Sequence, residues 1–206
     1  MKLKPILAIL FLTAAILGNF QGFSGAVAQP LEYSYELYLP LVAKPLLEWT
    51  LHKTSDNLHP DGNEQQMVWL MNHARANPTQ EGIWLATTDE PDIAFGRDYF
   101  NVDIVLLQSE FASYSAKPPA AFDARLYNAA KVHSLDLIAR DAQDHLNQFE
   151  QIDAEGFHYV AARGNVFAFA DSALNAHGAF NIDWDMDDDD GMQPGRGHRA
   201  AIMSLD

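Results

Sequence analysis

The chain has 206 residues, contains no cysteine and carries a formal net charge of −15. That much negative charge repels phosphate backbones and anionic lipid surfaces, so we expect no nucleic-acid partner. The absence of cysteine excludes disulfides and thiol catalysis. A folded domain in this chain must therefore be held together by its hydrophobic core.

Residues 1–28 have the pattern of a secretory signal peptide. Lys2 and Lys4 precede the apolar run "ILAILFLTAAIL", and the tripeptide "AVA" ending at Ala28 places small residues at a cleavage site. The apolar run is about a dozen residues long, whereas a membrane span takes roughly 20. Cleavage would remove two lysines and no acids, leaving a charge of −17. We therefore expect a secreted, extracellular protein with no membrane span after signal cleavage; an uncleaved signal anchor is the alternative.

Residues 29–60 are rich in Leu, Tyr and Pro. Proline at this density breaks helices and confines any strand to the edge of a sheet. We expect this stretch to be an extended leader. It precedes one domain at residues 61–206, whose roughly 145 residues are enough for an ordinary hydrophobic core.

The first predicted helix begins at Asp61, because Glu64 three residues later completes a capping-box pattern. Its apolar residues recur at helical spacing, and Asn77-Pro78 ends it. The apolar face consists of Met67, Leu70, Met71 and Ala74. A mixed segment with one short helix is expected to follow, up to the break at Pro118-Pro119.

The clearest predicted helix covers "FDARLYNAAKVHSLDLIARDAQDHL", residues 122–146, with Asp123 as its N-cap. One apolar face is formed by Leu126, Ala130, His133 and Leu137. Because His133 lies on this apolar face, we expect it to be buried and hydrogen-bonded. His145 is placed at the helix end, one turn after Asp141, where a role in a cleft and a role as a charge on the helix dipole both stay open. A final helix is expected to start with its first turn at Gly197-His198.

The run "DWDMDDDDG" has the alternating aspartates with which an EF-hand calcium loop begins. Asp183, Asp185 and Asp187 occupy positions 1, 3 and 5, but position 6 is Asp188 instead of glycine. Position 12, which must supply a bidentate glutamate, is Pro194. The EF-hand pattern fails, and two interpretations of Asp187–Asp190 stay open: a looser calcium site and a solvated acidic loop.

Sequence templates for catalysis are also negative. No H-E-x-x-H zinc motif and no serine nucleophile elbow occurs after residue 28. His198 follows glycines 195 and 197 and is expected at a helix N-terminus, where the dipole disfavours a protonated ring. A neutral imidazole in this position suits a ligand or a hydrogen-bond bridge, and simple capping is the alternative.

Five segments in order resemble the bacterial branch of the CAP superfamily, which groups cysteine-rich secretory proteins, antigen 5 and plant pathogenesis-related 1 proteins. They are "EQQMVWLMNHARANP", "PPAAFDARLYNAAKVHSLDLIARDAQDH", "GNVFAFA", "HGAFNIDW" and "GMQPGRGHRAAIM". The resemblance covers the chain from about Asn63 to its end. It implies an α+β fold, a three-layer α-β-α sandwich (SCP-like domain) with an open cleft. It also implies that the last strands of the sheet are missing, so that the domain is incomplete at its C-terminus.

The same resemblance implies a site. His145 corresponds to the first cleft histidine, whereas the usual glutamate of a Gly-Glu-Asn motif is replaced here by Gly164. The cleft residues are then His145, His198 and Asp183, with His145 and His198 as metal candidates for a divalent metal, zinc or calcium. No catalytic residue is assigned.

The function expected from the sequence is a secreted CAP-like binding or interaction module without catalysis, directed at an unknown extracellular ligand or protein. The alternative is a metal-assisted extracellular hydrolase, peptidase-like, that uses the cleft histidines. Loss of the glutamate at position 164 counts against the second function, because glycine can neither accept a proton nor bind a metal.

Overall fold

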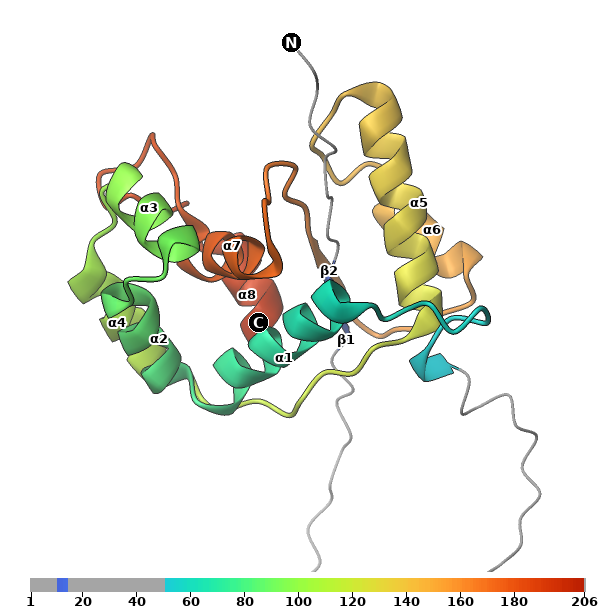
Figure 1. Ribbon diagram of the computed structural model, residues 1–206, viewed down its shortest axis with the longest axis horizontal. Coiled ribbons are helices and arrows are strands. Elements are labelled where there is room, and N and C mark those ends of the chain that lie inside the picture. The colour runs from blue at the N-terminus through green and yellow to red at the C-terminus, as the bar shows by residue number, and fades with distance from the viewer. Residues whose placement is uncertain (1–10, 15–50, 206) are drawn as a thin grey trace, which may run out of the picture.

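The computed structural model describes residues 11–14 and 51–205 (Figure 1). The rest of the predicted signal peptide and most of the predicted leader lie outside the described residues. The helices are α1 (Gly62–Ala76), α2 (Pro78–Thr87), α3 (Pro91–Tyr99), α4 (Ile104–Ser113), α5 (Ala124–Arg140), α6 (Gln148–Ala154), α7 (Ala173–Gly178), the π-helical turn η2 (Ala179–Asp183) and α8 (Gly197–Met203). The strands are β1 (Phe11–Ala14) and β2 (Ala162–Asn165), which pair antiparallel with Phe11 opposite Asn165.

The predicted three-layer α-β-α sandwich is wrong. The structure is 57% helix and 4% strand, and its described residues contain no sheet layered between helices. The stretch expected to be mixed folds into three helices, α2, α3 and α4. Pro78 and Pro91 explain two of them, because each takes the first position of a helix, where the fixed φ of proline is favourable and its missing N–H costs nothing.

The predicted start of the first helix is confirmed. Asp61 accepts a hydrogen bond from the backbone N–H of Glu64 at 2.9 Å, and Glu64 Oε2 accepts one from the N–H of Asp61 at 2.7 Å. At the other end, Asn77 closes α1 and its side chain caps α2 by accepting from the N–H of Gln80. One residue thus ends one helix and begins the next.

The main hydrophobic core lies between α1, α2, α3, α4, α7, η2 and α8. Its fully buried large side chains include Met67, Leu85, Phe111, Phe180 and Met203. Arg199 of α8 is also fully buried here, with its guanidinium 4.9 Å from the centre of the Phe111 ring. Of the described helices, α5 and α6 contribute no residue to this core. In Figure 1 they stand on one side, with α7 and α8 between them and α2, α3 and α4.

Helix α5 begins as predicted, with the Asp123 side chain accepting from the N–H of Arg125 at 2.9 Å. It ends earlier than predicted, because Asp141 adopts a left-handed backbone conformation with φ of 52° and closes the helix after Arg140. His145 therefore lies in the loop between α5 and α6, and its predicted place at a helix end is wrong. His133 is fully buried and its Nε2 is 3.0 Å from the carbonyl oxygen of Asp144, so its predicted buried, hydrogen-bonded role is confirmed.

The last predicted helix is confirmed as α8, which begins at Gly197. Within the described residues, no helix combines the length and the apolar character needed to cross a membrane.

Candidate functional site

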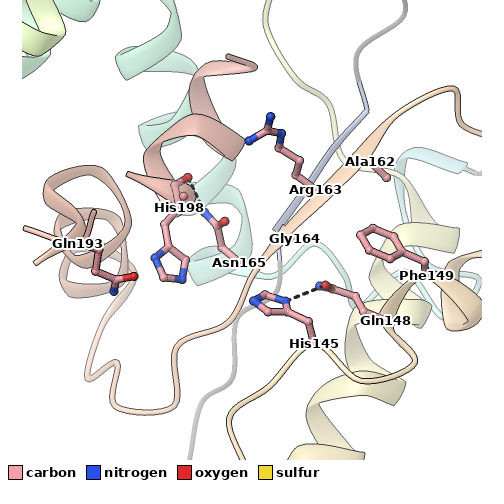
Figure 2. A pocket seen from close by; sticks show the side chains of 10 residues that line it. His145, Gln148, Phe149, Ala162, Arg163, Gly164, Asn165, Gln193 and His198 are labelled. Carbon is pink, nitrogen blue, oxygen red and sulfur yellow. Dashed lines mark hydrogen bonds between the residues drawn. The ribbon is translucent and has the colours of Figure 1, made fainter. Parts of the chain in front are cut away.

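A pocket of about 340 Å³ lies where the α5–α6 loop, β2 and the start of α8 meet (Figure 2). Both histidines proposed from the sequence, His145 and His198, line it, although 53 residues separate them in the chain. The full lining is His145, Gln148, Phe149, Ala162, Arg163, Gly164, Asn165, Gln193, Gly197 and His198. None of these ten described residues carries a carboxylate.

His198 is held from behind by Asp183, the third predicted cleft residue. The ring Nδ1 of His198 lies 2.7 Å from Oδ1 of Asp183, and the backbone N–H of His198 donates to Oδ2 at 2.9 Å. The Asp183 side chain is fully buried, and it does not line the pocket. Because a carboxylate oxygen is an acceptor, this geometry places a ring proton on Nδ1, and in the neutral imidazole Nε2 then carries the lone pair.

Asp183 occupies its place through a strained backbone. It ends η2 with φ of 61°, a left-handed conformation that costs a residue other than glycine on the order of 1 kcal/mol. Arg199 holds the two residues before it: its Nε donates to the carbonyl of Asn181 at 2.5 Å and its Nη2 to that of Ile182 at 2.8 Å. Arg199 also pairs with Glu110 of α4. The second arginine of "GRGHR" therefore connects α8 to the turn that presents Asp183.

His145 is held by a neutral amide. Its Nδ1 lies 2.9 Å from Oε1 of Gln148, the first residue of α6 (Figure 2). Asp141, which precedes His145 by one turn in the sequence, serves as the C-cap of α5. His145 is exposed, whereas Gln148 is buried. As with His198, an oxygen acceptor at Nδ1 leaves Nε2 free to accept.

Strand β2 connects the two sides of the pocket through neighbouring residues. Asn165 donates from Nδ2 to the backbone carbonyl of His198 at 3.0 Å, as Figure 2 shows. Gly164 lies directly against the Gln148 side chain, and a Cβ on residue 164 would sit 2.6 Å from Cδ and 2.8 Å from Oε1 of Gln148. The strand thus fixes the distance between the helix that carries His198 and the helix that carries Gln148.

The acidic run does not gather into a cation site. Asp190 accepts a hydrogen bond from Nη2 of Arg196 at 2.6 Å and another from the backbone N–H of Met192. The described residues contain a single group of three or more histidine and acidic side chains with ligand atoms close together: His59, Asp61 and Glu64. Two members of that group, Asp61 and Glu64, form the capping box of α1, and Nδ1 of His59 lies 2.9 Å from Glu64 Oε2.

Sequence reasoning missed Gln148, Asn165 and Gln193. Glutamine three residues after His145 is the one local signal that was present, because a side chain at that spacing can reach back to a preceding ring. Asn165 had no such signal, since its partner is the backbone of a residue 33 positions away.

Comparison with known proteins identifies no relative of this chain. No family model matches the chain, and no curated protein or solved structure matches it. The resemblance to the CAP superfamily therefore depends on the order of the five sequence segments alone.

Proposed function

We propose that this protein is a secreted binding module, CAP-like in the order of its segments, whose pocket binds a divalent transition-metal ion through Nε2 of His145 and Nε2 of His198. The observation that carries the proposal is the matching pair of Nδ1 contacts: both rings are anchored through Nδ1 to an oxygen acceptor. Histidines that bind metals usually donate their other ring N–H to a carboxylate or carbonyl in this way, which fixes the tautomer and the ring orientation.

The donor set favours zinc over calcium. Imidazole nitrogen suits zinc and copper, whereas calcium takes six to eight oxygen ligands, several of them carboxylates. The pocket lining offers two imidazoles and the amide side chains of Gln148, Asn165 and Gln193, and it contains no carboxylate. Calcium is therefore the poorer candidate of the two metals.

Binding is favoured over hydrolysis by the same lining. A metal held by two imidazoles keeps coordination positions open, and an extracellular ligand with an oxygen or nitrogen donor can fill them. A metal-assisted hydrolase also needs a general base within hydrogen-bond reach of the attacking water. The carboxylate in contact with His198, that of Asp183, is fully buried and already accepts hydrogen bonds from the ring and the backbone of His198.

Isothermal titration of the full chain with Zn²⁺ tests the proposal. We expect one zinc ion per chain, an affinity at least ten times weaker in His145→Ala and in His198→Ala, and no heat of binding with Ca²⁺. His158→Ala is the matched control, because His158 is exposed and does not line the pocket. Zinc binding that is unchanged in both pocket variants would refute the proposal. A casein or ester hydrolysis activity that His145→Ala abolishes would favour the hydrolase instead.

A further inference from the structure

We infer that Gln148 is a positioning residue for His145 and that Gly164 is the residue that makes room for it. The inference rests on the proposed function, in which Nε2 of His145 is a ligand atom. It assigns a role to two residues outside the histidine pair, one on α6 and the other on β2.

The burial of Gln148 calls for an explanation. Its side chain is 1% exposed, and its Nε2 is buried without a hydrogen-bond partner among the described residues. An unpaired buried amide N–H is destabilising, so this side chain is poorly explained as a contribution to stability. The other half of the same amide does have a partner: Oε1 lies 2.9 Å from Nδ1 of His145. The polar contact that Gln148 makes is therefore the one that orients the pocket histidine.

A side chain larger than that of glycine at position 164 does not fit beside Gln148 in its present position. The Cβ of any residue other than glycine at position 164 would overlap the carboxamide of Gln148, with Nε2 the nearest atom. The added Cβ would come closer to the carboxamide than a real Cβ contact allows, so the amide has to shift from the position in which it contacts Nδ1 of His145. A side chain at position 164 therefore acts on His145 through Gln148. The glutamate that the family resemblance expects at this position would need the space that Gln148 fills.

The consequence is a defined tautomer. A histidine without a fixed partner can carry its proton on either ring nitrogen, and the hydrogen bond at one nitrogen decides which. In the neutral ring, the carbonyl oxygen of Gln148 at Nδ1 favours the tautomer with the proton on Nδ1, and the lone pair is then on Nε2. When that contact is lost, His145 distributes its proton over both nitrogens, and a fraction of the chains lacks a ligand atom.

Imidazole nitrogen NMR on the metal-free full chain, at about pH 8 where an ordinary imidazole is neutral, measures this directly. We expect His145 to be protonated on Nδ1 in the native chain. Gln148→Ala and Gly164→Ala should each mix the two tautomers and weaken zinc binding about tenfold. Gln148→Glu should restore the Nδ1–H tautomer, because its carboxylate is also an acceptor. A double variant, Gln148→Ala with Gly164→Ala, should be no worse than either single one, since all three lose the same hydrogen bond.

The matched control is Gly62→Ala, a glycine outside the pocket whose added Cβ would meet no atom within 4 Å. It should keep both the tautomer and the zinc affinity. An Nε2-protonated His145 in the native chain, or a Gly164→Ala variant with native tautomer and affinity, would overturn the inference. Because the tautomer is measured without metal, a native chain with the expected tautomer but no zinc binding would refute the proposed function and leave the positioning role standing.

Discussion

The two sides of the pocket hold equivalent histidines by different means. His198 belongs to α8, which packs into the main core, and its partner is the fully buried carboxylate of Asp183. His145 lies in an exposed loop, and its partner is the neutral amide of Gln148, which is kept in place by its fit against Gly164. The orientation of the His198 ring therefore depends on the stability of the fold, whereas the orientation of the His145 ring depends on local packing. Substitutions on the His198 side should therefore affect stability and binding together, and those on the His145 side should affect binding alone.

Arg199→Ala should produce the largest effect. It removes the donors to the carbonyls of Asn181 and Ile182 and leaves Glu110 without one of its partners, so we expect a loss of about 3–5 kcal/mol in the free energy of unfolding. Urea denaturation measures it. Arg140→Ala is the control on the His145 side: Arg140 pairs with Asp136 and Asp144 at the surface, where ion pairs contribute little. Equal losses in the two variants would contradict the contrast between the two sides.

Asp183→Asn should come next. The amide keeps the shape of the carboxylate but removes the charge that fixes the His198 ring, so zinc affinity should fall about 10–100-fold. The melting temperature should fall as well, because two backbone N–H groups of α8 lie against Oδ2 of Asp183. Calorimetry and thermal unfolding check the two effects. A variant that loses affinity at native stability would show that this side behaves like the His145 side.

Asp123→Asn tests the acid sensitivity of the α5 side. Burial raises the pKa of the Asp123 carboxyl, but hydrogen bonds from the Arg125 side chain and backbone outweigh it, so the pKa lies below its ordinary value. A lowered pKa in the folded state stabilises the fold above the ordinary carboxyl pKa, and this stabilisation is lost as the pH falls through the folded pKa. Near neutral pH the free energy of unfolding should be about 1 kcal/mol higher in the native chain than in the variant. Urea denaturation should show that this difference disappears in acid. A gap that is independent of pH would contradict this assignment.

His145→Ala should have the smallest effect on stability, within about 0.5 kcal/mol, because its side chain is exposed. The same substitution should still abolish most of the zinc affinity. Thermal unfolding of the metal-free chain measures the first effect. A clear loss of stability would mean that His145 has a structural role beyond its contact with Gln148.

Local signals were predictable from the sequence, and long-range ones were not. The capping box at Asp61 and the N-cap at Asp123 were found because each depends on residues within three positions. The end of α5 was missed because the left-handed conformation of Asp141 has no marker such as glycine. The sandwich was expected from the order of the segments, and that order carries no information about strand pairing in this chain.

The site shows the same division. His145, His198 and Asp183 were predicted as cleft residues from the family resemblance, but the Asp183–His198 contact depends on Arg199 holding carbonyls 17 and 18 residues away. Gln148 was missed although it lies three residues after His145, because a glutamine has no motif of its own and its role depends on a glycine 16 positions later. Packing between distant segments, rather than local propensity, assigns these roles.

A double-mutant cycle for zinc binding tests the central claim most directly, which is that His145 and His198 contribute to one site. Zinc affinity is measured by titration calorimetry in the native full chain, in His145→Ala, in His198→Ala and in the double variant. If both rings bind the same ion, the double variant should be little weaker than either single variant, because each single change already removes the shared site. Losses that simply add, or a single variant with native affinity, would show that the two histidines act independently and would contradict the account.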